Sequence, residues 1–153
     1  MAYSTSEGRE ELLGVIAEAI GMLGAAIESL SSAYDQLDDL AGERLEEGLF
    51  SSVQRAYALS MRTYTGFAGR RPGVESTGPE SPAAATRSGD ARDLITAASE
   101  AAGRADSALA GLQDKPVLIE VGDTELRAGL ASTREAVSAV PGQAQELLRT
   151  LGR

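Results

Sequence analysis

The chain contains no cysteine, histidine or tryptophan, and Lys115 is its single lysine. The absence of cysteine excludes disulfides, thiolate nucleophiles and thiolate metal sites. The absence of histidine removes the commonest general base and the Glu-x-x-His pairs of di-iron bundles. A serine or threonine nucleophile would lack a base, because no Ser-x-x-Lys arrangement accompanies Lys115. We therefore expect a protein without enzymatic activity, with no catalytic residue, no cofactor and no metal.

Basic residues are also scarce relative to acidic ones. Fourteen Lys and Arg stand against 23 Asp and Glu, which gives a formal net charge of −9 at pH 7. Arg70 and Arg71 are the only adjacent basic residues. Since nucleic acids and anionic lipids are bound mainly through clustered Lys and Arg, we expect no nucleic-acid partner.

Acidic residues gather between positions 35 and 47. These residues are Asp35, Asp38, Asp39, Glu43, Glu46 and Glu47. The segment lacks the Asp-x-Asp-x-Asp-Gly spacing of a calcium loop. Carboxylates at the start of a helix are favoured by the helix dipole, so we interpret this cluster as a solvated turn followed by a helix N-terminus.

Long hydrophobic runs are nearly absent. The most apolar stretch, residues 12–27, is interrupted by Glu18 and preceded by Glu7, Glu10 and Glu11. It is shorter than a typical membrane span, and a secretory signal would carry positive charge before it. We expect no membrane span and a cytoplasmic protein, with export without a cleavable signal peptide as the alternative.

What the chain does contain is a repeat of apolar residues at alternating spacings of four and three, which is typical of one buried helix face. The first stripe comprises Ile16, Ile20, Leu23, Ile27, Leu30, Tyr34 and Leu37. The second comprises Leu45, Leu49, Phe50, Val53, Tyr57, Met61, Tyr64 and Phe67. The third comprises Ile95, Ala98, Ala102, Ala105, Leu109 and Leu112. The fourth comprises Leu126, Leu130, Thr133, Val137, Val140, Ala144, Leu147 and Leu151.

Turn and capping residues divide these stripes. Gly42 predicts the break between the first two helices, and Asp123 is the predicted cap of the fourth. Pro141 predicts a kink or a restart in the fourth helix, because the stripe keeps its phase there. Residues 116–121, PVLIEV, have no partner strand and are predicted to be an extended connector.

The fold class is therefore all-α: two long helical hairpins joined by a flexible linker and packed as a four-helix bundle. The N-terminal hairpin spans residues 1–68, the Pro/Gly/Ser-rich linker spans 69–89, and the C-terminal hairpin spans 90–153. Five of the six aromatic residues lie between 34 and 67, whereas 68–153 contain none. We expect the C-terminal hairpin to depend on the first for its core.

Two groups of residues are candidates for partner binding. Gly14, Ala17, Gly21 and Gly24 form a seam of small residues beside the first stripe. A glycine inside a helix costs roughly 1 kcal/mol relative to alanine, so we expect compensation from a second helix packed closely over this seam. On this interpretation, Gly21→Leu disrupts the packing.

The second group lies on the second helix. Tyr57, Met61 and Tyr64 share one helix face, where they either pack in the core or line a pocket between helices.

The segment from Ala33 to Tyr57 adds a resemblance to a known family. A long helix ending in AYDQLDDLAG, a tight turn and then ERLEEGLFSSVQRAY resembles the helical hairpin of the WXG100, or ESX-type, proteins of actinobacteria, over residues 7–68. Ala41, Gly42 and Glu43 stand where that family has its Trp-x-Gly turn. The Tyr-x-x-x-Asp/Glu pattern of its secretion signal is matched by Tyr34 with Asp38 and by Tyr3 with Glu7. The resemblance implies a helical partner-binding protein that is secreted or acts beside a secretion system.

Two function classes follow. The first is a non-enzymatic helical protein-protein interaction module, forming a homo- or hetero-oligomer with a helical protein. The alternative is a small ligand-binding or regulatory helical domain.

Overall fold

The computed structural model of the chain describes residues 5–70 and 89–151, and these residues form helices and no strand. The all-α prediction is confirmed. In chain order the elements are α1 (Thr5–Tyr34), α2 (Asp39–Arg44), the π-helix η1 (Leu45–Phe50), α3 (Ser51–Gly69), α4 (Ala91–Gln113), α5 (Pro116–Val121), α6 (Thr124–Ser138) and α7 (Val140–Leu151). Most of the predicted linker, residues 71–88, lies outside the described residues.

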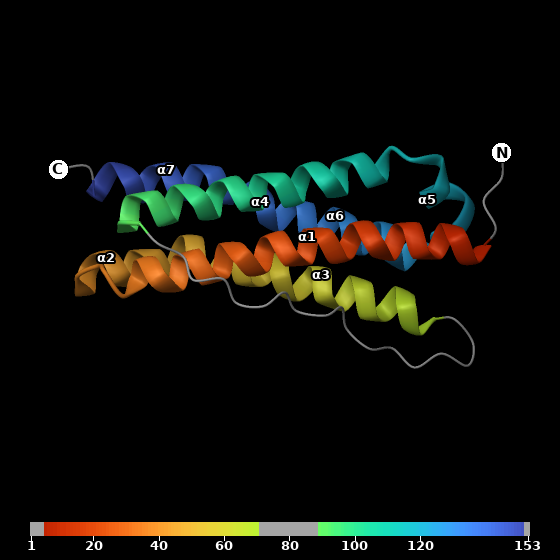
Figure 1. The fold of residues 1–153 in the computed structure, drawn as a ribbon, viewed down its shortest axis with the longest axis horizontal. Coiled ribbons are helices and arrows are strands. Elements are labelled where there is room, and N and C mark those ends of the chain that lie inside the picture. The colour runs from red at the N-terminus through yellow and green to blue at the C-terminus, as the bar shows by residue number, and fades with distance from the viewer. Residues whose placement is uncertain (1–4, 71–88, 152–153) are drawn as a thin grey trace.

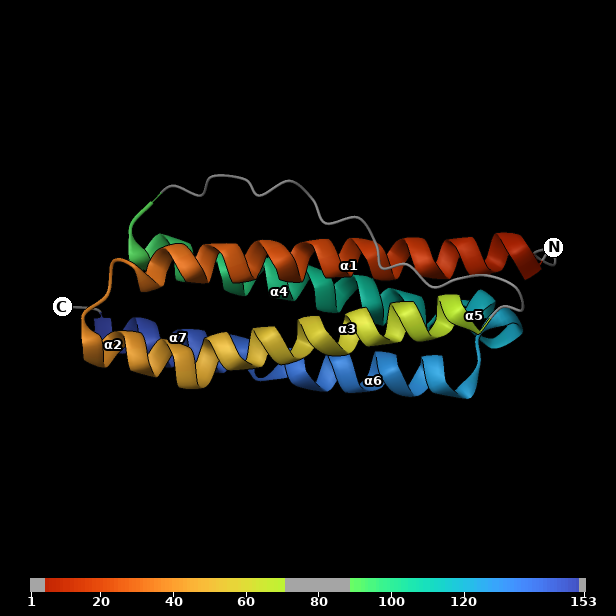
Figure 2. The ribbon, with the colours of Figure 1, turned by 90° about the horizontal axis from the view of Figure 1, so that it is seen from below.

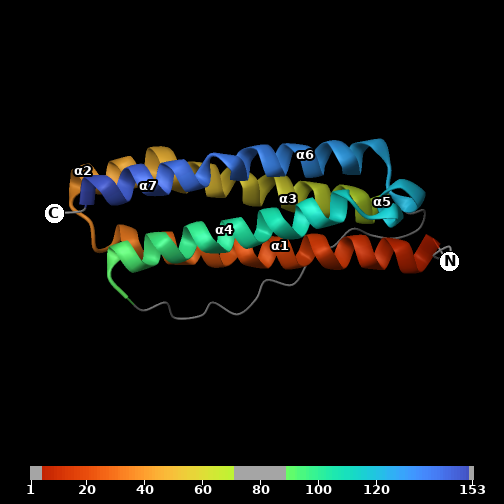
Figure 3. The same cartoon turned by 90° about the horizontal axis from the view of Figure 1, so that it is seen from above.

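The long helices lie side by side in an elongated bundle (Figure 1). Helix α1 packs against both α3 and α4, and α6 packs against the same two helices from the other side. Neighbouring helices run antiparallel, so α3 and α4 run in the same direction (Figures 2 and 3). The end of α3 and the start of α4 therefore lie at opposite ends of the bundle. The first helix therefore has two helical neighbours, α3 and α4.

A single apolar core runs along the bundle and contains residues from both halves of the chain. The third and fourth predicted stripes are buried except for Leu151, which is partly exposed. The first two stripes are buried in part. Tyr34 is 48% exposed, and Ile27, Tyr57, Met61 and Tyr64 are half-buried. The pair α1 and α4 makes the most extensive helix contact, and both helices bury alanines, which permit close packing of their axes.

Aspartate side chains begin three of the helices. Asp90 accepts a hydrogen bond from the Asp93 amide at 2.9 Å, and Asp123 accepts one from the Leu126 amide at 2.7 Å, as expected of N-cap residues. The cap of Asp123 was predicted from the sequence.

The predicted break at Gly42 is wrong. Asp38 caps α2 by accepting a hydrogen bond from the Ala41 amide at 2.8 Å, so the chain turns over residues 35–38 and Gly42 lies inside a helix. An N-cap aspartate satisfies free amides of the first turn, and here this determines where the helix starts.

The predicted extended connector at 116–121 is also wrong. It forms the short helix α5, which has Pro116 at its first position, where proline loses no helical hydrogen bond. Val117 and Leu118 of α5 are buried. A Cβ at Gly8 of α1 would lie 3.1 Å from Cγ2 of Val117, so α5 packs closely against the first turns of α1.

The fourth helix restarts near Pro141, as predicted. Helix α6 ends at Ser138 and α7 begins at Val140, in the same overall direction (Figure 3). Both segments keep their apolar residues on the core side. The interruption therefore changes the axis of the helix and leaves its buried face intact.

The predicted close packing over the α1 glycine seam is wrong for the described residues. A Cβ at Gly14 or Gly21 would meet no described atom within 4 Å, and one at Gly24 would make ordinary contact with Tyr57 at 3.6 Å. The closest approach of this kind occurs instead between α6 and α3, where a Cβ at Gly129 would collide with the side chain of Thr63.

Helix α1 is long and apolar enough to cross a membrane, judged by length and composition alone. No membrane span was expected from residues 12–27, which include Glu18, whereas α1 has 30 residues. In this structure α1 supplies the core with residues such as Leu12, Ile16 and Leu23, each 0% exposed.

Candidate functional site: a groove between two interrupted helices

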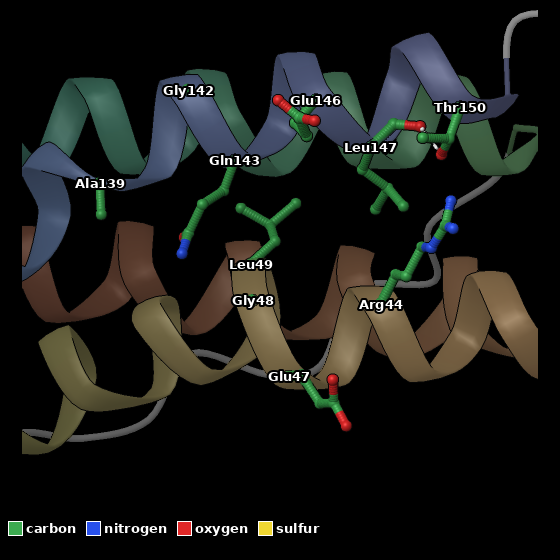
Figure 4. Close-up of a pocket in the computed structure, with 10 residues that line it drawn as sticks. All are labelled: Arg44, Glu47, Gly48, Leu49, Ala139, Gly142, Gln143, Glu146, Leu147 and Thr150. Carbon is green, nitrogen blue, oxygen red and sulfur yellow. Dashed lines mark hydrogen bonds between the residues drawn. The ribbon is translucent and has the colours of Figure 1, made fainter.

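A hollow lies between η1 and α7, near the end of the bundle where α2 begins (Figure 4). It has a volume of about 900 Å³ and is open along one side. Its lining residues are Arg44, Glu47, Gly48, Leu49, Ala139, Gly142, Gln143, Glu146, Leu147 and Thr150. None of these residues was among the candidates for partner binding in the sequence.

Both walls of the groove are formed where a helix departs from regular geometry. On one wall, residues 45–50 form a π-helix within an otherwise continuous helical stretch from Asp39 to Gly69. On the other, the chain breaks at Ala139 before α7. Single π turns inside α-helices frequently occur at functional sites. Two such irregularities therefore face each other across one hollow.

The π-helix carries part of the buried stripe of the second helical segment. Leu45, Leu49 and Val53 are all buried, although they are separated by four residues twice in succession. In a regular α-helix, two steps of four residues rotate a side chain by about 80° around the axis. The wider π turn reduces this rotation, although α1 buries Leu12, Ile16 and Ile20 at the same spacing in a regular helix.

Glycines create much of the free space. Gly48 lies on the η1 wall and Gly142 on the α7 wall. A Cβ at Gly142 would meet no described atom within 4 Å, and one at Gly48 would come only within 3.9 Å of Nε2 of Gln143. Leu49 and Leu147 extend from the two walls into the floor (Figure 4) and are 1% and 5% exposed.

A polar atom without a partner lies in the groove. The side chain of Gln143 extends from α7 towards η1 (Figure 4). Its Oε1 atom is buried and forms no hydrogen bond with a described residue. A buried acceptor in this condition typically costs about 1–3 kcal/mol. The terminal torsion of a glutamine side chain has broad minima, so this amide can reorient at little cost.

Charged residues line the rims. Glu47 and Glu146 lie on opposite walls, and the Arg44 side chain reaches from α2 towards α7 (Figure 4). All three are exposed, and none forms an ion pair with another described residue. Their charges therefore remain available to a bound molecule.

The structure partly joins the two groups of residues predicted for partner binding. Gly24 of α1 faces Tyr57 of α3, and Tyr57, Met61 and Tyr64 are half-buried along α3. Gly14 is exposed, whereas Ala17 and Gly21 are partly exposed. None of these seven residues lines the groove between η1 and α7.

Two smaller hollows flank the same region. One of about 330 Å³ is lined by Ser31, Tyr34, Asp35, Glu46 and Phe50. Another of about 280 Å³ lies between α3 and α6 and includes Arg55, Ser132 and Glu135. Neither contains Tyr57, Met61 or Tyr64, so neither corresponds to the predicted pocket. Within residues 5–70 and 89–151, no group of three or more acidic side chains is placed to hold a metal ion.

Comparisons with known proteins add no further assignment: no family model matches the chain, and no curated protein or solved structure is similar to it.

Proposed function

We propose that this protein is a non-enzymatic helical interaction module that binds a segment of a partner protein in the groove between η1 and α7. The observation that carries the proposal is the groove itself, with its glycine walls and the unpaired Oε1 of Gln143. Open, elongated hollows between helices suit the insertion of a peptide or helix, as in other helix-in-groove complexes.

The shape of the hollow favours this function over the binding of a small molecule. Small-molecule sites usually enclose most of the ligand surface. Here one side is open, and the α7 wall extends from Ala139 to Thr150, a length of about 16 Å at the standard helical rise. A partner segment of about three helical turns would match that length.

The same proposal includes the finer architecture. We take the protein to be a four-helix bundle of two helical hairpins, with residues 7–68 forming a WXG100-like hairpin. The packing of α1 on α3 and of α4 on α6 supports the two hairpins, and the packing of α4 on α1 and of α6 on α3 supports their joining into one bundle. A cytoplasmic location is proposed, with signal-independent export as the alternative.

A groove-filling substitution tests the proposed function. Gly142→Leu places a side chain in the groove, where a Cβ meets no described atom. Gly103→Leu is the matched control, because a Cβ at this exposed position of α4 also meets no described atom. Both glycines lie in helices with negative φ, so the backbone effects should be similar.

The measurement is capture of partners from native lysate by the full-length protein and both variants, with light scattering of each purified protein. We expect a bound partner, or a second copy of the chain, to be retained by Gly103→Leu and lost from Gly142→Leu. Equal retention by the two variants would contradict binding in this groove.

A further inference from the structure

We propose that the occupant of the groove is a basic amphipathic helix of a partner protein, with Lys or Arg on both flanks of an apolar ridge. This inference rests on the proposed function and specifies the chemistry of the partner. Three features support it: the acidic residues on the rims, the glycines in the two walls and the side-chain amide of Gln143.

The rims favour cations on both sides of the occupant. Glu47 lies on one wall with its side chain directed away from α7 (Figure 4), and Glu146 lies on the other wall. Each is exposed and forms no ion pair with a described residue. Glu43, also exposed, adds negative charge on α2, whereas Glu46 lines the separate hollow beside Tyr34 and Phe50. Arg44 is the only cation among the lining residues. Cationic flanks would therefore meet carboxylates along both edges.

The negative charge of the surrounding chain also favours a basic partner. Residues 35–47 contain six acidic residues and one basic residue, and the whole chain carries a net charge of −9. Such a field attracts a basic partner and raises the rate of encounter. It disfavours a second copy of this chain, which brings the same negative charge to the interface.

The middle of the groove favours apolar side chains of modest size. Gly48, Gly142 and Ala139 leave the walls without large side chains, and Leu49 and Leu147 form an apolar floor. Apolar residues at positions i, i+3, i+4 and i+7 of an inserted helix would lie along this strip. Gln143 lies in the same strip, where a donor on the occupant could pair with its amide oxygen.

The test uses two synthetic peptides of eleven residues with leucines at identical positions of a helix face. The basic peptide has lysine at its other positions, and the acidic peptide has glutamate there. Binding to the full-length protein is measured by fluorescence anisotropy. We expect binding of the basic peptide alone, and we expect Gly142→Leu to weaken it while Gly103→Leu leaves it unchanged.

Charge-removing variants separate specific from general attraction. The double variant Glu47→Gln/Glu146→Gln should weaken binding of the basic peptide by about fivefold or more, as expected for the loss of two exposed ion pairs. The matched double variant Glu18→Gln/Glu28→Gln removes the same charge from exposed positions of α1 and should change binding by less than about twofold, since salt screens distant charges.

Three results would overturn the inference: equal weakening by the two double variants, equal binding of both peptides, or binding of neither. Failure of this inference can be distinguished from failure of the proposed function. A native partner lost from Gly142→Leu but retained by Glu47→Gln/Glu146→Gln would support the groove and reject a basic occupant.

Discussion

The guanidinium of Arg9 lies over the ring of Phe67, 4.2 Å from its centroid, and donates a hydrogen bond of 2.6 Å to the Phe67 carbonyl oxygen. Arg70 approaches the same ring at 5.8 Å. It also pairs with Asp123 at 2.6 Å and with Glu125 at 3.1 Å. These contacts join the start of α1, the end of α3 and the start of α6. They fix one end of the bundle, whereas the groove lies towards the other end (Figure 1).

Phe67→Ala should remove the centre of this cluster. Phe67 is 0% exposed and is among the largest fully buried side chains. Truncation should lower the free energy of unfolding by about 3–5 kcal/mol, through lost burial and a residual cavity. Phe67→Leu, which keeps most of the apolar volume, should cost roughly 1 kcal/mol. Urea denaturation measures the free energy of unfolding of both variants. Similar losses for the two variants would show that the ring does not fill the space described.

The contact between Arg70 and Asp123 predicts a dependence on pH. The hydrogen bond from Arg70 lowers the pKa of the Asp123 carboxyl below its ordinary value of 3.8, and this effect exceeds the opposing effect of burial. A lowered folded-state pKa adds stability above the unfolded-state value, and that stability is lost as the pH falls through the folded-state pKa.

Asp123→Asn removes the charge and keeps a side chain able to cap α6. We expect it to be less stable than the parent near neutral pH, by less than about 1 kcal/mol because the pair is partly exposed. The difference should shrink in acid below the ordinary pKa of 3.8. Glu120→Gln, at an exposed position without an ion pair, is the control. A difference that persists unchanged in acid would contradict this account.

Replacement of glycine by alanine should have opposite effects on stability at positions 21 and 129. Gly21→Ala should stabilise the protein by about 0.5–1 kcal/mol, since a Cβ there meets no described atom and helix propensity improves. Gly129→Ala should destabilise it, because the added Cβ collides with Thr63 and overpacking costs roughly 1–3 kcal/mol. The denaturation midpoints of the two variants measure these effects. A greater loss of stability for Gly21→Ala than for Gly129→Ala would contradict this expectation.

Dissection of the chain tests the dependence of its second half on its first. Helix α4 buries several alanines against α1, and α6 packs mainly on α3. A fragment of residues 90–153 should therefore show little helix by circular dichroism and gain helix on mixing with residues 1–68. Cooperative folding of the C-terminal fragment alone would indicate two independent domains.

Sequence periodicity predicted the long helical segments, because Ile16, Leu109 and Leu130 belong to stripes that only a helix can bury together, but it missed the short helix α5. It also predicted the cap at Asp123 and the restart near Pro141, since both depend on local chemistry. The glycine seam of α1 was misjudged. Whether Gly21 or Gly129 meets a neighbour depends on the rotation and position of another helix. The spacing of residues within one helix carries no information about either.

The groove could not be predicted for a related reason. It arises where η1 and α7 face each other, and these segments lie about ninety residues apart in the chain. The spacing of Leu45, Leu49 and Val53 gave no signal either, because the regular helix α1 buries Leu12, Ile16 and Ile20 at the same spacing.

The central claim is that a partner binds between η1 and α7. The most direct measurement is backbone amide mapping by NMR on the full-length isotope-labelled protein, titrated with the basic peptide. We predict the largest shift changes at Gly48, Gly142 and Gln143, with small changes at Gly14 and Gly21 on the outer side of α1. Changes concentrated at Gly14 and Gly21, with the groove residues unaffected, would contradict the claim.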